Sequence, residues 1–370
     1  MRIGLDGRFW SEEAAGIARY SRELVKNLLK IDKKNEYFLF LLPKEFKKCK
    51  LKAKNLNLIS ITSPHYSLRE QAKLPLELAK IKLDFIHFLN FYHPFFWKGR
   101  FLVTVHDLTL FFYPTRRGKT FIHQLAMKLV MKNAIKKALK IIVPSNSTKK
   151  DIIKKFKNQN SKLKVIYEGV PKEFKPLSTK TISQFKKKKK LTSPFLLYIG
   201  QWRPHKNLIK LVEAFEIARK ETDFQLVIAG KPDLKYKELI SKIKKSGYKK
   251  DIITPGFIPD EELPLWYNSA TAFIFPSLYE GFGLPPLEAM GCGAPVLASK
   301  VSSLPEVLGT AALYFNPGNS KAIAGEILKV FKNSNLRKKM SQESLKQVKK
   351  FSFEKMAQQT LEVYNTALKH

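Results

Sequence analysis

The chain has 370 residues, more than one hydrophobic core usually serves, so we expect two domains of ordinary size. Its 44% hydrophobic and 12% aromatic residues exclude a wholly disordered chain, and its two cysteines, Cys49 and Cys292, exclude a disulfide framework and fit a reducing compartment. Basic residues (68) outnumber acidic ones (31), and the resulting net charge of +37 favours nucleic acid, anionic lipid or phosphorylated ligands as partners.

Short apolar runs alternate with longer segments of helical period, which is typical of parallel sheets covered by helices, so the expected fold class is α/β. The strands predicted in the first half are Arg2 to Leu5, Tyr37 to Leu42, Leu56 to Ile61, Phe85 to Phe88, Phe101 to Val105, Lys140 to Val143 and Lys164 to Tyr167. Those predicted in the second half are Phe195 to Ile199, Gln225 to Ile228, Ile252 to Thr254, Thr271 to Phe275 and Pro295 to Ala298.

The pattern predicts two Rossmann-like domains. The first covers residues 1–175 and the second residues 195–350. Between them, residues 176–194 contain Ser, Thr and a run of lysines and are predicted to form a linker. An amphipathic segment at residues 351–370 is predicted to be a final helix.

Basic residues are concentrated in the first half, where residues 1–175 carry a net charge of +23 and the remainder +14. Lysines recur every four residues at Lys128, Lys132, Lys136 and Lys140, and so line one helix face. We expect the apolar residues on the other faces to pack on the sheet, namely Phe121, Leu125, Leu129 and Ala138. The basic stripe is either a solvated face or a docking site for anionic lipid.

The most informative segment runs from Pro276 to Gly291, after one predicted strand and into a helix. Gly281 and Gly283 allow the backbone to approach a ligand closely, and the N–H groups at a helix start bind anions such as phosphate. Glu280 in the loop and Glu288 in the helix can accept hydrogen bonds from sugar hydroxyls. The segment therefore predicts a phosphate cradle flanked by two carboxylates.

This segment, EGFGLPPLEAM from Glu280 to Met290, resembles the signature of the retaining nucleotide-sugar glycosyltransferases of family 4, also called group 1. Other segments agree with that family in order and spacing: Gly16 to Tyr20, Thr104 to Leu108, Val165 to Val170, Gly200 to Leu208, Ala229 to Gly230, Gly256 to Ile258 and Ser303 to Val307. The resemblance implies a GT-B fold, with two Rossmann-like domains facing across a cleft and a C-terminal helix that crosses back to the N-terminal domain.

The resemblance also implies roles for individual residues. The catalytic residues would be His106, which contacts the transferred sugar from the acceptor domain, and Glu280, which binds that sugar. The residues that would bind the nucleotide sugar are Gly16, Arg203, Lys206, Gly230, Ile258, Phe282, Gly283, Leu284 and Glu288, the last through the ribose hydroxyls. Many relatives carry further basic residues where this chain has Gln201 and His205, so which cation besides Lys206 binds the diphosphate stays open.

The function expected is transfer of a hexose from a nucleotide sugar to a glycan or polyprenyl-linked glycan acceptor in cell-surface polysaccharide synthesis, with retention of configuration. The resemblance is greatest to bacterial mannosyltransferases, which makes GDP-mannose the favoured donor and leaves UDP-glucose and UDP-GlcNAc as alternatives. No Asp-x-Asp motif occurs at a strand end, so no cofactor or essential metal is expected.

A basic nucleic-acid-binding protein is the alternative of another class, but the chain contains no recognised nucleic-acid-binding motif, so we expect no nucleic acid partner. No signal peptide is apparent, and no apolar run approaches the roughly 20 residues that span a bilayer. We therefore expect a cytoplasmic enzyme that touches the inner face of the plasma membrane peripherally.

Overall fold

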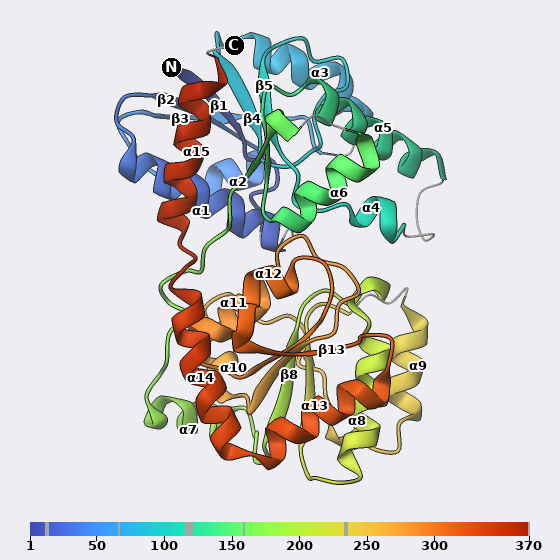
Figure 1. The fold of residues 1–370 in the computed structure, drawn as a ribbon. Coiled ribbons are helices and arrows are strands. Elements are labelled where there is room, and N and C mark those ends of the chain that lie inside the picture. The colour runs from blue at the N-terminus through green and yellow to red at the C-terminus, as the bar shows by residue number, and fades with distance from the viewer. Residues whose placement is uncertain (12–14, 66, 115–120, 158–159, 233–235, 369–370) are drawn as a thin grey trace. The chain divides into compact units, whose positions relative to one another are not determined.

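The computed structural model describes residues 1–370 except 12–14, 66, 115–120, 158–159, 233–235 and 369–370. It divides into two compact units, drawn in Figure 1. Unit 1 comprises Met1–Gly169 and Ser352–His370, and unit 2 comprises Val170–Phe351.

Unit 1 contains a seven-stranded parallel sheet of order β3-β2-β1-β4-β5-β6-β7. Its strands are β1 (Arg2–Asp6), β2 (Glu36–Leu41), β3 (Leu56–Ser60), β4 (Phe85–Phe88), β5 (Phe101–Thr104), β6 (Ile141–Val143) and β7 (Leu163–Val165). Its helices are α1 (Ala15–Ile31), α2 (Pro43–Lys48), α3 (Leu68–Ala79), α4 (Thr109–Phe112), α5 (Phe121–Lys137), α6 (Asn146–Phe156) and α15 (Phe353–Ala367). Because parallel crossovers are right-handed, α1 and α2 cover one face of the sheet and α3, α5 and α6 the other.

Unit 2 contains a six-stranded parallel sheet of order β10-β9-β8-β11-β12-β13. Its strands are β8 (Phe195–Ile199), β9 (Gln225–Ala229), β10 (Ile252–Ile253), β11 (Ala272–Phe275), β12 (Val296–Ser299) and β13 (Ala312–Phe315). Its helices are α7 (Thr179–Lys188), α8 (Leu208–Arg219), α9 (Lys237–Lys245), α10 (Leu263–Ser269), α11 (Leu284–Gly291), α12 (Leu304–Leu308), α13 (Ser320–Lys332) and α14 (Ser334–Val348). The short turn η3 (Pro204–Lys206) precedes α8.

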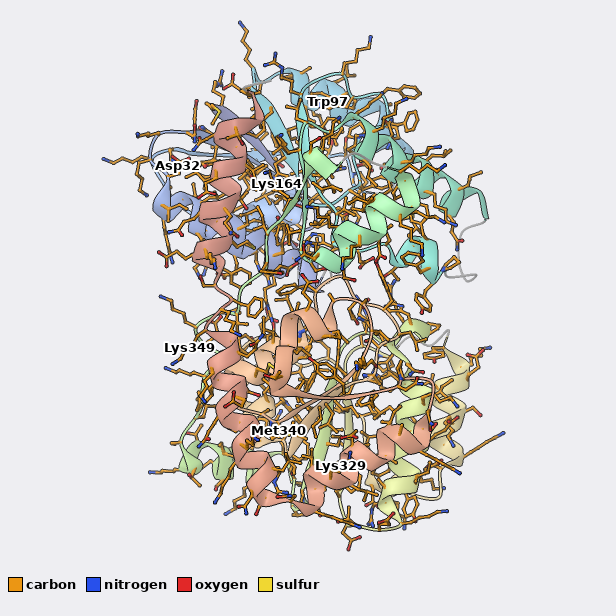
Figure 2. All side chains as sticks on the ribbon, viewed as in Figure 1. Asp32, Trp97, Lys164, Lys329, Met340 and Lys349 are labelled. Carbon is orange, nitrogen blue, oxygen red and sulfur yellow. The ribbon has the colours of Figure 1, made fainter. Side chains whose placement is uncertain are left out.

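All the strands predicted from sequence are present, within two residues at each end, and β13 is an additional strand that the sequence analysis missed. The connection between β1 and β2 shows how side chains fix the local geometry. Asp32, labelled in Figure 2, lies just after α1 and accepts hydrogen bonds from Asn35 and, at 2.5 Å, from the Tyr37 hydroxyl of β2. These bonds stabilise the carboxylate, so the pKa of Asp32 is lowered even though burial opposes its charged form.

The expected organisation needs its main correction at residues 176–194, which were predicted to form a linker. The Ser178 hydroxyl accepts a hydrogen bond from the Thr181 N–H and caps α7 at its N-terminus. Phe185 of α7 is buried and meets the Trp266 ring of α10, with the ring centroids 5.4 Å apart. The linker interpretation was therefore wrong, because most of this lysine-rich stretch forms a capped helix that packs on unit 2 through its buried Phe185.

The C-terminal helix α15 returns to unit 1, as the sequence predicted, and lies along α1 in Figure 1. Its Ser352 cap accepts a hydrogen bond from the Lys355 N–H. One face of the helix is buried in the same core as α1, at spacings of three and four residues: Phe353, Met356, Ala357, Val363, Tyr364 and Ala367. Since each large apolar side chain contributes about 1.5–3 kcal/mol on burial, this helix is an integral part of unit 1.

Helix α5 differs from the prediction for its apolar residues. Leu125 and Leu129 do not pack on the sheet but are 47% and 49% exposed. The buried face is formed instead by Val130, Met131, Ala134 and Ile135, while Ala138 is buried as expected and the side chain of Phe121 lies outside the described residues. Lys132 and Lys136 are exposed, Lys128 is half-buried, and Lys140 lies beyond the end of the helix.

Candidate functional site

Six strands follow the same order in both sheets, with β7 added at the edge of the unit 1 sheet, and this order locates the ligand-binding edges. In open parallel sheets of this order, ligands bind beyond the carboxyl ends of the strands where the order reverses. In unit 2 the reversal lies between β8 and β11. The segments that leave these strands are residues 200–207 and 276–283, which carry the motifs identified in the sequence.

The loop after β11 ends at the glycine that starts α11. Gly283 is the N-cap of that helix, with a positive φ of 101°, and an added Cβ would lie 2.8 Å from the Leu304 side chain. Pro285 and Pro286 occupy the first helical turn, as predicted, and have no N–H. The N–H groups that this helix start offers to an anion are therefore those of Gly283 and Leu284.

Glu280 is held in the loop by an ion pair and by two serines. Its Oε1 lies 2.5 Å from the Nζ of Lys206, and both side chains are about 15% exposed. Its N–H donates to the Ser302 hydroxyl at 2.9 Å, and the Ser303 hydroxyl donates to the carbonyls of Glu280 and Phe282. The predicted sugar-binding and diphosphate-binding residues thus contact each other directly in this structure.

Glu288 lies one turn into α11 and is only 2% exposed. The Tyr267 hydroxyl of α10 donates a hydrogen bond to its Oε2 at 3.0 Å. Tyr267 was not predicted, since nothing in the sequence around it marks it as a partner of the motif. This bond orients the carboxylate that the resemblance assigns to the ribose.

The loop after β8 approaches the end of β9 closely. Gly230 has a φ of 131°, and a Cβ there would collide with the carbonyl oxygen of Gly200, so only glycine fits. Asn207, with a φ of 60°, donates from its side-chain amide to the carbonyls of Pro276 and Pro317. Lys206 is therefore presented two residues before α8 by a loop that is bonded to the β11–α11 segment.

The remaining residues predicted in unit 2 differ in accessibility. Arg203 is exposed and forms no ion pair within the part of the chain that the structure describes, whereas Ile258 is 6% exposed. His205 is buried, and burial together with the nearby Lys206 and Arg203 lowers its pKa to about 3. His205 is therefore neutral at physiological pH and adds no second positive charge beside Lys206.

In unit 1, His106 lies just beyond β5, at the carboxyl edge of the sheet. Its Nε2 is 2.9 Å from the carbonyl oxygen of Leu89, and its Nδ1 is 3.5 Å from Oε1 of Glu168. Glu168 belongs to a motif noted in the sequence, but its contact with His106 was not foreseen. Gly16 lies exposed at the start of α1.

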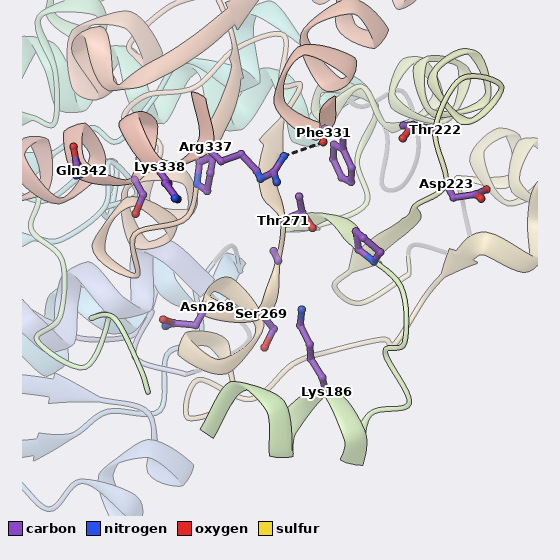
Figure 3. Close-up of a pocket in the computed structure, with 14 residues that line it drawn as sticks. Lys186, Thr222, Asp223, Asn268, Ser269, Thr271, Phe331, Arg337, Lys338 and Gln342 are labelled. Atoms are coloured by element: carbon purple, nitrogen blue, oxygen red, sulfur yellow. Dashed lines mark hydrogen bonds between the residues drawn. The ribbon is translucent and has the colours of Figure 1, made fainter. Parts of the chain in front are cut away.

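A pocket of about 670 Å³ lies elsewhere in unit 2 and is shown in Figure 3. Thr222 and Asp223 line it just before β9, and Thr271 lines it just before β11, so it opens at the amino edge of the sheet. Arg337 donates to the Phe331 carbonyl there at 2.8 Å, which caps the end of α13. Because the motif residues lie at the carboxyl edge, this pocket is separate from the candidate site.

Two further observations bear on the expected chemistry and location. Within the described ranges, no group of three or more His, Cys, Asp and Glu side chains could hold a metal ion. No helix among the residues that the structure describes is long and apolar enough to cross a membrane.

Comparison with known proteins gives matches along nearly the whole chain. A family model described as Glycosyltransferase Family 4 matches residues 14–174, and one described as Glycosyl transferases group 1 matches residues 179–347. The O-antigen chain mannosyltransferase B of Escherichia coli is 30% identical over 94% of this chain and 95% of its own. The O-antigen chain mannosyltransferase RfbU of Salmonella typhimurium is 30% identical over 60% of this chain and 58% of its own.

Among solved structures, the sucrose-phosphate synthase from Thermosynechococcus elongatus matches with a TM-score of 0.79. The match covers 99% of this chain and 98% of that one at 20% sequence identity, and so shows a shared GT-B fold. Both family models match, and one relative is similar along nearly its full length. The chain therefore belongs to the group 1 glycosyltransferases of family 4 and is a hexosyltransferase.

Proposed function

We propose that this enzyme is a retaining mannosyltransferase that transfers mannose from GDP-mannose to a glycan or polyprenyl-linked glycan during cell-surface polysaccharide assembly. The observation that carries the proposal is the similarity to an O-antigen chain mannosyltransferase over 94% of this chain. Unit 2 would bind the donor and unit 1 the acceptor, in keeping with the motifs on each.

Departure of the nucleoside diphosphate builds negative charge on its phosphates, and three groups of unit 2 are suited to stabilise it. These are the Lys206 ammonium and the N–H groups of Gly283 and Leu284. One such preorganised donor contributes about 3 kcal/mol in comparable sites. On donor binding, Lys206 would exchange Glu280 for the diphosphate, and the released carboxylate would accept hydrogen bonds from the sugar hydroxyls.

The two glutamates are not arranged as the acid and nucleophile of a glycosidase. Glu280 is paired with Lys206, and Glu288 accepts a hydrogen bond from Tyr267, so neither is set up as an acid and nucleophile flanking one sugar. We propose front-face attack by the acceptor, with the leaving diphosphate taking up the acceptor proton. No divalent metal is required in this scheme.

Helix α5 supports a peripheral contact with an anionic membrane. Leu125, Leu129, Lys132 and Lys136 are spaced so that they share one helical face, and all four are exposed. Phe112 of α4 is also 43% exposed. Residues 108–150 contain ten basic side chains and no acidic one, so no carboxylate of this segment competes with lipid phosphates. An apolar and basic face of this kind is suited to the headgroup boundary of a bilayer.

The proposal is tested with the purified enzyme, a polyprenyl-diphosphate-linked oligosaccharide and each of GDP-mannose, UDP-glucose and UDP-GlcNAc, with and without EDTA. We expect transfer from GDP-mannose, an α-linked product by NMR, and unchanged activity in EDTA. Transfer from a UDP sugar alone would assign a different donor. An inverted product, or loss of activity in EDTA that Mg²⁺ restores, would overturn the corresponding part of the scheme.

The nucleic-acid alternative is tested by adding RNA to the same enzyme at physiological salt. We expect thermal stabilisation by GDP-mannose through mass action and no saturable RNA complex. Tight RNA binding without any response to nucleotide sugars would contradict the proposed function.

A further inference from the structure

The His106 ring faces a hydrogen-bond acceptor at each of its nitrogens. Nε2 lies 2.9 Å from the Leu89 carbonyl oxygen, which can only accept, so Nε2 must carry a hydrogen. Nδ1 lies 3.5 Å from the Glu168 carboxylate. A bare lone pair on Nδ1 would be repelled by that carboxylate, whereas an N–H would be attracted. The geometry therefore favours the ring with both nitrogens protonated.

The other groups around His106 do not oppose that charge. Asp107 is the next residue in the chain and favours the charged ring, and the Tyr20 ring of α1 stands edge-on at 4.7 Å between centroids. His87, on the neighbouring strand β4, is neutral because burial lowers its pKa to about 3. Burial by itself would lower the pKa of His106, but the hydrogen bond and charge of Glu168, the Leu89 carbonyl and Asp107 outweigh burial, and this pKa is raised.

Glu168 is fixed by the start of the C-terminal helix. It is 4% exposed, and a Cβ on the next residue, Gly169, would collide with the backbone of Ser352 and Phe353. This packing restricts the backbone that carries Glu168. The carboxylate is thus confined beside the ring, and the absence of a side chain at Gly169 is what permits α15 to begin there.

A chain of hydrogen bonds runs from α15 to Tyr20, whose ring contacts His106. The Tyr364 hydroxyl is 2.6 Å from Nδ1 of His87, and Nε2 of His87 is 2.9 Å from the Thr104 hydroxyl. That hydroxyl is 2.9 Å from the Tyr20 hydroxyl, and the Tyr20 ring contacts His106. The helix therefore supports His106 both through Glu168 and through Tyr20.

From this arrangement we propose that Glu168 is a positioning residue that keeps His106 doubly protonated and fixed at the carboxyl edge of the unit 1 sheet. With both N–H groups committed to Leu89 and Glu168, His106 cannot act as a general base. The ion pair is neutral as a whole, so a sugar that gains positive charge beside it meets no uncompensated cation. The kinetic consequence rests on the proposed function, whereas the protonation state does not.

The protonation state is tested by NMR titration of selectively labelled histidine in the full-length enzyme, with the His106 signal assigned by its loss in His106→Gln. We expect His106 in the wild type to stay protonated to a higher pH than in Glu168→Gln, because the amide lacks the charge that favours the imidazolium. Glu168→Asp, which keeps the charge, should restore part of the difference. Glu362→Gln, an exposed glutamate of α15, is the matched control and should titrate as the wild type.

The same variants then give pH profiles of kcat/KM for transfer from GDP-mannose. Loss of the charged partner should lower kcat/KM by about tenfold or more at neutral pH and move the alkaline limb of the profile to lower pH. An unchanged His106 titration in Glu168→Gln would overturn the proposal, whatever the activity. A shifted titration in an enzyme that transfers no sugar would instead leave the inference standing and count against the proposed function.

Discussion

At the scale of single residues, the charged side chains proposed to bind the donor already have partners in the structure. Lys206 and Glu280 pair at 2.5 Å, and the Lys206 ammonium also lies 5.3 Å from the centre of the Phe275 ring. The ion pair holds the Lys206 side chain against the β11–α11 loop, in which Glu280 lies. In the proposed scheme, donor binding would break this ion pair and form two new interactions, which would link recognition of the diphosphate to recognition of the sugar.

Replacing Lys206 with Met should remove the positive charge at the diphosphate. We expect kcat to fall by about 10²–10³-fold, the usual effect of losing one preorganised donor at a site of developing charge. Steady-state transfer assays measure the effect, and circular dichroism checks the fold. Lys210→Met is the matched control and should retain near-normal activity, because the Lys210 side chain is 40% exposed and pairs with Glu213 of the same helix, α8. Equal activity of the two variants would contradict the role of Lys206.

Replacing Tyr267 with Phe tests whether orientation of Glu288 matters. The substitution removes the hydroxyl that donates to Oε2 of Glu288 at 3.0 Å and keeps the buried ring. Since a hydrogen bond to a charged group contributes about 1.5–3 kcal/mol, the Kd for GDP should rise by roughly tenfold or more. Isothermal titration calorimetry measures that Kd. A Kd equal to that of the wild type would show that Glu288 does not need Tyr267.

At the scale of elements, sequence patterns located most of the fold because buried parallel strands are short apolar runs that are easy to see. The patterns failed where the alternation of buried and exposed residues is mixed, or where contacts with other elements decide. Strand β13 has a mixed burial pattern, with Leu313 and Tyr314 partly exposed, and so lacks the signal of the other strands. Helix α7 depends on Phe185 within a lysine-rich segment, and the exposure of Leu125 and Leu129 on α5 depends on which neighbours cover that helix.

The same distinction applies to the site. Motif residues such as Glu280, Lys206 and Glu288 could be recognised because their spacing in the chain is characteristic. Ser302 and Tyr267, which bond to Glu280 and Glu288, come from other elements, as does Glu168, the partner of His106, and only the folded structure brings these residues into contact. The sequence therefore identified the residues that we propose to bind substrate, but not the residues that position their side chains.

Helix α15 should contribute stability to unit 1 through Tyr364, which is fully buried and bonded to His87. Tyr364→Phe leaves the buried His87 without that partner and should lower the free energy of unfolding by about 1–3 kcal/mol. Chemical denaturation followed by circular dichroism measures the change. Glu362→Gln on the exposed side of the same helix should leave it unaltered. A destabilisation as large in the control as in Tyr364→Phe would mean that the His87 bond carries no special weight.

At the scale of the whole molecule, the net charge of +37 is spread over both units, and Figure 2 shows nitrogen-tipped side chains projecting around both. Most of these lysines are solvated, and their combined positive charge attracts the protein to any anionic surface. A specific membrane contact requires apolar residues next to the cations. Among the described residues, α5 offers that combination through Leu125, Leu129, Lys132 and Lys136.

We therefore predict that the intact enzyme sediments with phosphatidylglycerol-containing vesicles and not with phosphatidylcholine vesicles. Since each basic residue near an anionic surface contributes about 1 kcal/mol, Lys132→Glu with Lys136→Glu should weaken binding by roughly 30-fold or more at 0.1 M salt. Leu125→Ser with Leu129→Ser should also weaken binding, and this loss should persist at 1 M salt, where charge is screened.

The matched control is Lys338→Glu with Lys339→Glu, at two exposed lysines of α14. This variant changes the net charge equally and should bind almost as the wild type. Equal weakening by the α5 and α14 charge reversals would show that total charge, rather than the α5 face, governs membrane binding.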